Sequence, residues 1–218
     1  MTRRHFRSDD RVSVDLVTIL IALEASNAIA LASDSAMLIT DDVDNFTTQQ
    51  ALPKIWEHPS NPDLLWGFTG DGAVGAQFGD WLRAESPDSW NGLLPAAGEK
   101  LARLNKEGKR LARIAGALKQ FEAVGVLMVG YLGPDRESKV ISMSSAGAAY
   151  PIEPGHLAVC AGSHAQAAAL ASWAAAWKIA PDADAAKVFT AVLESTIDTI
   201  PALGGPIQLK VITATLKG

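Results

Sequence analysis

Two short apolar runs near the N-terminus constrain the fold of this chain more than any other feature. Residues 17–23 (VTILIAL) and 28–35 (AIALASDS) are separated by the short segment 24–27 (EASN). A loop of this length between two β-type runs is typical of a hairpin. The first strand begins with Thr18 and the second ends with Asp34, and antiparallel pairing brings these two ends together. A hydroxyl and a carboxylate at one end of a hairpin suit a threonine nucleophile in a polar site.

The bulk composition narrows the class of protein. The 218 residues are 48% hydrophobic and 20% charged, which is enough for a sizeable core. A net charge of -5 argues against nucleic acid or an anionic membrane as a partner. No run approaches the roughly 20 apolar residues that would cross a bilayer. The single cysteine, Cys160, excludes an intrachain disulfide and favours a cytoplasmic protein.

The predicted order of elements is strands, two helices, strands, two helices and a final strand. We expect residues 1–13 to be a flexible polar arm and residues 14–218 to form a single domain. Residues 39–51 are interpreted as a surface loop or an edge strand, and residues 58–63 and 150–155 as turns, since proline interrupts a central strand. This order predicts an α/β (α+β) class, a layered sandwich with mostly antiparallel sheets.

Each predicted helix has an apolar face. The first begins at about residue 70, where Asp71 is a candidate N-cap, and ends before Pro87. The second spans residues 93–118, with one apolar stripe. The residues of that stripe are Leu101, Leu104, Leu111 and Leu118. Seven lysines and arginines, six on this helix and Lys119 directly after it, are interpreted as a solvated face or a contact with an acidic partner, not as a nucleic-acid surface. The third helix contains Trp173 and Trp177, and the fourth begins near Asp182.

Several short segments occur together in a characteristic order. These are residues 18–23, 30–35, 54–56, 66–70, 124–131, 158–162 followed by 163–169, and 204–209. The ordered set, which spans roughly residues 16 to 216, resembles the proteasome family: proteasome subunits and the bacterial HslV-type peptidase, within the N-terminal-nucleophile (Ntn) hydrolases. The resemblance implies a four-layer αββα sandwich that assembles with copies of itself into a homo-oligomer or ring.

The resemblance also implies a site. Thr18 falls at the nucleophile, Asp34 at the first aspartate and Gly70 at the glycine whose amide contacts the oxyanion. The lysine position is held by Lys54 or, if the strand is matched differently, by Ala51. In this family the threonine is the first residue of the mature chain and its own α-amino group is the base, since that group has a pKa of about 8. No cofactor and no metal are implied.

The sequence departs from the family pattern at the remaining site positions. The serine before the third helix is replaced by Ala161, although Ser163 is close. The last aspartate–serine pair falls on Ile200 and Leu203, and Asp198 would serve only with a local insertion.

Processing is a further departure, because the family frees its threonine by cutting after glycine, and here Val17 precedes Thr18. Two functional hypotheses follow. The first is a threonine-type peptidase or amidohydrolase that uses Thr18 after cleavage, with a peptide substrate and an unfoldase as candidate partners. The second is a non-catalytic structural or binding subunit that keeps its arm, as α-type proteasome subunits do. A related amidohydrolase acting on a small amide is a third interpretation.

Each site residue also has an ordinary structural interpretation. Thr18 suits a strand by propensity alone, because its side chain is β-branched. Asp34 would bind backbone amides at a strand end, Lys54 would be solvated, and Gly70 would allow the turn into a helix. Cys160 is interpreted as a small buried hydrophobe.

Overall fold

The structure of the chain is a computed structural model that describes residues 18–24, 28–35, 37–40, 46–49, 52–161, 169, 185–200, 203 and 205–213. The predicted arm of residues 1–13, the predicted helix with Trp173 and Trp177, and Asp182 lie outside these residues.

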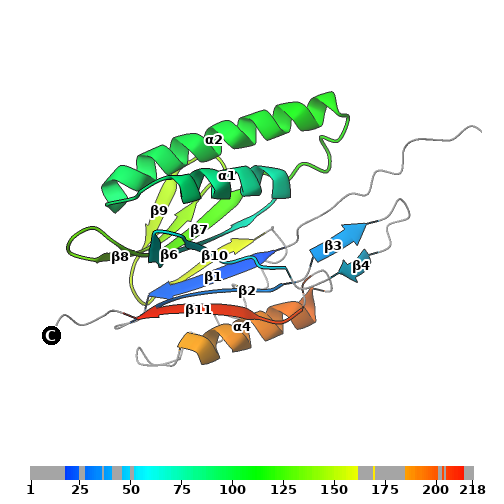
Figure 1. The fold of residues 1–218 in the computed structure, drawn as a ribbon. Coiled ribbons are helices and arrows are strands. Elements are labelled where there is room, and N and C mark those ends of the chain that lie inside the picture. The colour runs from blue at the N-terminus through cyan, green and yellow to red at the C-terminus, as the bar shows by residue number, and fades with distance from the viewer. Residues whose placement is uncertain are drawn as a thin grey trace, which may run out of the picture.

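Four layers stack in the order helix, sheet, sheet, helix (Figure 1). The first layer contains α1 (Gly72–Ala84) and α2 (Trp90–Ile114), and the last contains α4 (Ala185–Thr199). The sheet beneath α1 and α2 has the order β5 (Trp56–His58), β6 (Asn61–Thr69), β7 (Gly125–Leu132), β8 (Glu137–Met143), β9 (Ala149–Ile152). The sheet above α4 has the order β10 (Leu157–Ala161), β1 (Ile19–Glu24), β2 (Ala28–Ser33), β11 (Gln208–Thr213). Every pair of neighbouring strands is antiparallel, so the predicted αββα sandwich is confirmed.

The predicted hairpin is present as β1 and β2, with Leu20 opposite Ser33 and Glu24 opposite Ile29. Its side chains alternate between two apolar environments. Ile19 and Ile21 belong to the core between this sheet and α4, whereas Leu20 belongs to the core between the two sheets. Because both faces are buried, the strands are almost continuously apolar.

The first two helices, α1 and α2, each begin with a side-chain cap. Asp71 accepts a hydrogen bond from the amide of Val74 (2.9 Å), as predicted, and Ser89 accepts one from Gly92 (3.2 Å). Ser89 therefore starts α2 earlier than the sequence suggested. The predicted apolar stripe is correct at buried Leu101 and wrong towards its end. Leu111 is 51% exposed and Leu118 follows the helix, because the last turns of α2 extend beyond the sheet (Figure 1).

Two predicted turns are partly strands. Only residues 59 and 60 form the first turn, and Pro62 lies at the start of β6. Pro151 lies in β9, which is an edge strand where the missing N–H is tolerated. Residues 37–40 and 46–49 pair as a separate two-stranded sheet, β3 (Met37–Thr40) and β4 (Phe46–Gln49). This sheet begins two residues before the segment 39–51 that was interpreted as a loop or edge strand.

The buried side chain of Asn105 ties α2 to the start of β7. Its Nδ2 donates to the carbonyls of Leu101 (3.2 Å), Val124 (3.0 Å) and Ser145 (3.1 Å), and its Oδ1 accepts from the amide of Val124 (2.7 Å). This one side chain satisfies backbone groups from three segments, which fixes the helix layer on the sheet.

None of the helices in the described part of the chain is long and apolar enough to span a membrane.

Candidate active site

The predicted meeting of the two hairpin ends is present at the start of β1. Asp34 is fully buried and Thr18 is 3% exposed. The amide of Ile19, the residue after Thr18, donates to Asp34 Oδ1 at 3.1 Å. The carboxylate therefore lies against the backbone immediately after the threonine.

Lys54 pairs with this carboxylate. Its Nζ lies 3.0 Å from Asp34 Oδ1 and 2.9 Å from Oδ2, and the residue is 3% exposed. Of the two lysine-position alternatives, Lys54 is the one beside Asp34, and Ala51 lies outside the described residues. Burial lowers the pKa of Lys54 below its ordinary value, and the charge and hydrogen bonds of Asp34 oppose that shift only in part.

Gln208 holds the segment that carries Lys54, a role that the sequence did not reveal. Its Oε1 accepts from the amide of Lys54 (2.9 Å), and its Nε2 donates to the carbonyl of Leu52. The amide of Leu52 in turn donates to the carbonyl of Ser35 (3.0 Å). The strand register places Gln208 opposite Ser33, so the last strand, the hairpin and the lysine segment meet at one end of the sheet. The sequence holds no local signal for this role, because β11 is an edge strand in which only Ile212 is buried.

Two serines flank the aspartate. Ser33 donates its hydroxyl to the carbonyl of Asp34 at 2.5 Å. Ser35 is 1% exposed, and its Oγ has no hydrogen-bond partner within the described part of the chain. Ser33 therefore binds the backbone of Asp34 and not its carboxylate.

Gly70 has a local structural reason to be glycine. Its φ is +95°, and a Cβ at this position would lie 2.6 Å from the carbonyl oxygen of Ala123. The preceding residue, Thr69, places its Oγ1 3.5 Å from the Sγ of Cys160, and Cys160 pairs with Leu20 of β1. Gly70 therefore follows a strand whose end touches the strand beside β1.

Cys160, predicted to be a small buried hydrophobe, is partly buried in β10. Burial raises its pKa to about 11, which keeps it as the unreactive thiol near neutral pH. Among the described residues, no three His, Cys, Asp or Glu side chains gather as a metal site would need.

Three solved structures share this architecture. The Anbu complex from Pseudomonas aeruginosa, described as a helical assembly, aligns with a TM-score of 0.65 at 14% identity over 89% of this chain and 81% of that one. Eukaryotic HslV from Trypanosoma brucei aligns with a TM-score of 0.56 at 18% identity, over 89% and 99%. Thiobacillus denitrificans BPH in complex with epoxomicin aligns with a TM-score of 0.58 at 15% identity, over 91% and 99%.

The chain has the proteasome/HslV-type Ntn-hydrolase fold. No protein-family model matches the sequence, and no curated protein matches it. The likeness is therefore one of fold, in agreement with the resemblance inferred from the ordered segments.

Within this proteasome-type fold, the remaining site positions are apolar. Ala161 pairs with Ile19, as the last residue of β10. Leu203 is buried beneath the sheet, and Ile200 packs against the same core. Asp198 is exposed on α4 and lines a groove with β11, and Ser163 lies outside the described residues. Of the described residues at these positions, Ala161, Ile200 and Leu203 therefore add no polar group to the Asp34–Lys54 pair.

Proposed function

We propose that the chain is a self-assembling subunit of the proteasome/HslV type with a latent threonine hydrolase site at the start of β1. Thr18 is the nucleophile once residues 1–17 are removed, and the substrate is a peptide amide. The observation that carries this proposal is the buried Asp34–Lys54 ion pair, held against the amide that follows Thr18.

A buried ion pair is poor evidence for stability and better evidence for function. Removing two charges from water costs several kcal/mol per ion, and well-packed apolar residues are often at least as stable in their place. Burial already acts against the charged form of Lys54, as its lowered pKa indicates. A lysine kept at this end of the hairpin despite that penalty supports an electrostatic role beside the threonine.

The proposed chemistry assigns one task to each group. The freed α-amino group of Thr18 accepts the hydroxyl proton while Oγ attacks the carbonyl carbon of the substrate. The ammonium of Lys54 offsets the developing negative charge, and Asp34 holds that ammonium in place. The backbone N–H of Gly70 donates to the oxyanion. The leaving amine takes the proton, and water then hydrolyses the ester on Thr18.

Cleavage is a requirement of this proposal. Thr18 is only 3% exposed. Its α-amino nitrogen is part of the peptide bond with Val17, so it cannot act as the base before that bond is cut.

Intact mass and hydrolysis together test the proposal. The first material is the purified full chain. The second is a chain that begins with Met directly before Thr18, from which the cell removes the methionine. We expect the second chain to hydrolyse fluorogenic peptide amides and to gain the mass of epoxomicin, the ligand of the BPH complex. Thr18→Ala in that chain should abolish both results, and Thr18→Ser should keep part of the activity. A freed Thr18 with neither hydrolysis nor adduct would refute the hydrolase.

A non-catalytic structural or binding subunit is the second candidate function. It is favoured by the apolar residues Ala161, Ile200 and Leu203, which replace groups that would hold the α-amino group and move its proton. Full-length mass after purification, with no hydrolysis by the shortened chain, would support this candidate.

Self-association is common to both candidates. The helical assembly described for Anbu supports it. Native mass spectrometry of the full chain should give a multimer, and a monomer at micromolar concentration would contradict the proposal. We also propose a cytoplasmic location, based on the single cysteine, and an unfoldase as a partner of the catalytic form.

A further inference from the structure

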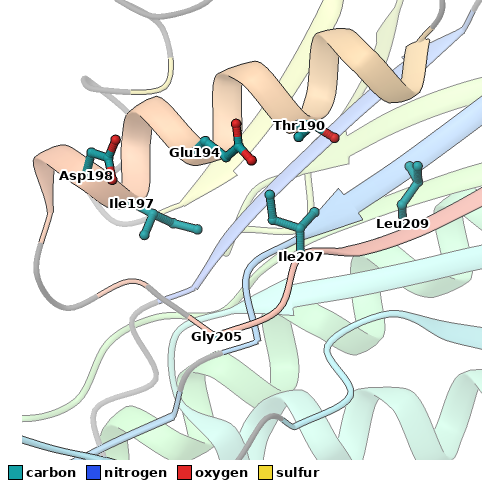
Figure 2. A pocket seen from close by; sticks show the side chains of 7 residues that line it. All are labelled: Thr190, Glu194, Ile197, Asp198, Gly205, Ile207 and Leu209. Carbon is teal, nitrogen blue, oxygen red and sulfur yellow. The ribbon is translucent and has the colours of Figure 1, made fainter.

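A groove of about 580 Å³ lies between α4 and β11 (Figure 2). On the helix side, Thr190, Glu194 and Asp198 follow one another at intervals of four, which places them on one face. On the strand side, Ile207 and Leu209 alternate along the chain and point to the same side. The groove therefore has an acidic rim and an aliphatic floor.

The groove is open along the edge of the sheet. Glu194 and Asp198 are exposed, while Ile207 and Leu209 are half-buried. Val211 continues the aliphatic row and is 50% exposed, and β11 is an edge strand. None of the described residues that line the groove is basic. An occupant with positive charges and an apolar side chain would complement it.

The N-terminal arm of the chain has this chemistry. Residues 1–7 read MTRRHFR and contain Arg3, Arg4 and Arg7 around Phe6, with no acidic residue before Asp9. Arginine pairs well with carboxylates in two-pronged geometry, and its planar head tolerates partial burial. Phe6 offers a large apolar side chain that can pack on the aliphatic floor of the groove.

The arm can reach the groove of its own molecule. Ser33 lies opposite Gln208, so the groove end at Ile207 is at the same end of the sheet as Thr18. β1 and β11 are separated only by β2, which places them roughly 10 Å apart. The 17 residues before Thr18 can extend to about 55 Å.

We propose that the groove between α4 and β11 is the docking site for the chain's own arm. Phe6 rests on the aliphatic floor, and the arginines pair with Glu194 and Asp198. The proposal is independent of any chemistry at Thr18, so an inactive protein would leave it intact.

Trypsin provides a direct test, because it cuts after the arginines that the docked arm would shield. The full chain is compared with Glu194→Gln/Asp198→Asn, and N-terminal products are followed by mass spectrometry. If trypsin cuts only the fraction of molecules whose arm is undocked, the loss of the charge pairs at Glu194 and Asp198 should speed cutting in the arm by about tenfold. Phe6→Ala leaves the cleavage sites and the described core unchanged and should also speed cutting.

The matched control is Asp135→Asn/Glu153→Gln, which removes two exposed acids outside the groove. Trypsin should cut this control variant at the same rate as the wild type. Sodium chloride at about 1 M should speed cutting in the wild type and have little effect on the groove variant.

Equal cutting rates for the wild type, the groove variant and Phe6→Ala would overturn the proposal. Equal acceleration by the control pair would also overturn it, because a general loss of negative charge would then be the cause. Protection that disappears on dilution would show that the arm of a second copy occupies the groove, and this would refute docking within one molecule.

Discussion

Lys54→Met is expected to destabilise the chain strongly, since it breaks the buried ion pair from one side. Asp34 is fully buried, and without the ammonium its carboxylate loses the opposite charge beside it, although the 3.1 Å bond from the amide of Ile19 remains. Removing one partner of a buried pair typically costs about 3–5 kcal/mol, because the other charge remains out of water. We expect a loss in that range at pH 7.

The double variant Asp34→Asn/Lys54→Met distinguishes the cost of leaving one buried charge unpaired from the cost of losing the whole pair. It removes both charges and leaves an amide oxygen that can accept from Ile19, so the loss should fall to about 1 kcal/mol. The single and double variants should therefore be coupled by at least about 2 kcal/mol. Urea unfolding followed by tryptophan fluorescence, at one fixed protein concentration, measures these values.

Lys210→Met is the matched control. Lys210 pairs with Glu57 at 2.5 Å, and both side chains are about half exposed (50% and 47%). An exposed pair contributes about 0–1 kcal/mol, so this variant should remain close to the wild type. Equal losses for Lys54→Met and Lys210→Met would refute the reasoning, and so would an additive cycle.

Burial also sets the sign of the pH dependence. The pKa of Lys54 is lower in the folded chain than in the unfolded chain, where it is near 10.5. Between those two pKa values the folded state binds fewer protons than the unfolded state, so this group makes the stability rise with pH. The same contribution to stability is lost as the pH falls through the folded pKa. Lys54→Met should lack that rise, and an identical alkaline profile for both proteins would contradict the assignment.

Three further variants and treatments test other parts of the structure. Cys160, with a pKa raised from 9.0 to about 11, should react with a thiol reagent at pH 8 about 100-fold more slowly than an exposed thiol, and unfolding should remove the difference. Gly70→Ala should cost clearly more than the roughly 1 kcal/mol expected for Gly116→Ala, which also has a positive φ but no neighbour within 4 Å; equal losses on urea unfolding would reject the close contact with Ala123. Asn105→Ala should cost about 3 kcal/mol on urea unfolding, because buried backbone groups, including the amide of Val124, lose their partner; a loss below about 1 kcal/mol would count against this network.

The elements that were predictable from the sequence are those fixed by local pattern. The hairpin follows from two apolar runs and a short turn, and the start of α1 follows from Asp71 as a cap. The extent of burial along α2 was not predictable. Helical periodicity identifies a face but not where the partner sheet ends, so Leu111 looked buried and is exposed. Pro151 was misread for a similar reason, because the identity of an edge strand depends on the whole sheet.

The candidate site was also predictable only where its residues are close in sequence. Thr18 and Asp34 belong to one hairpin, so their meeting was predictable from spacing. The lysine position depends on how the segment before it folds, which left Lys54 and Ala51 as alternatives until the pairing with Asp34 was visible. Gln208 was missed because a hydrogen bond between residues 154 positions apart leaves no local trace.

That long-range bond also bears on biosynthesis. Gln208 lies 154 positions after Lys54, so a nascent chain that ends before residue 208 contains the lysine but lacks the glutamine that binds its backbone. Such a chain also lacks β11, which pairs with the hairpin. The Asp34–Lys54 pair therefore gains this backbone support only after β11 has been synthesised.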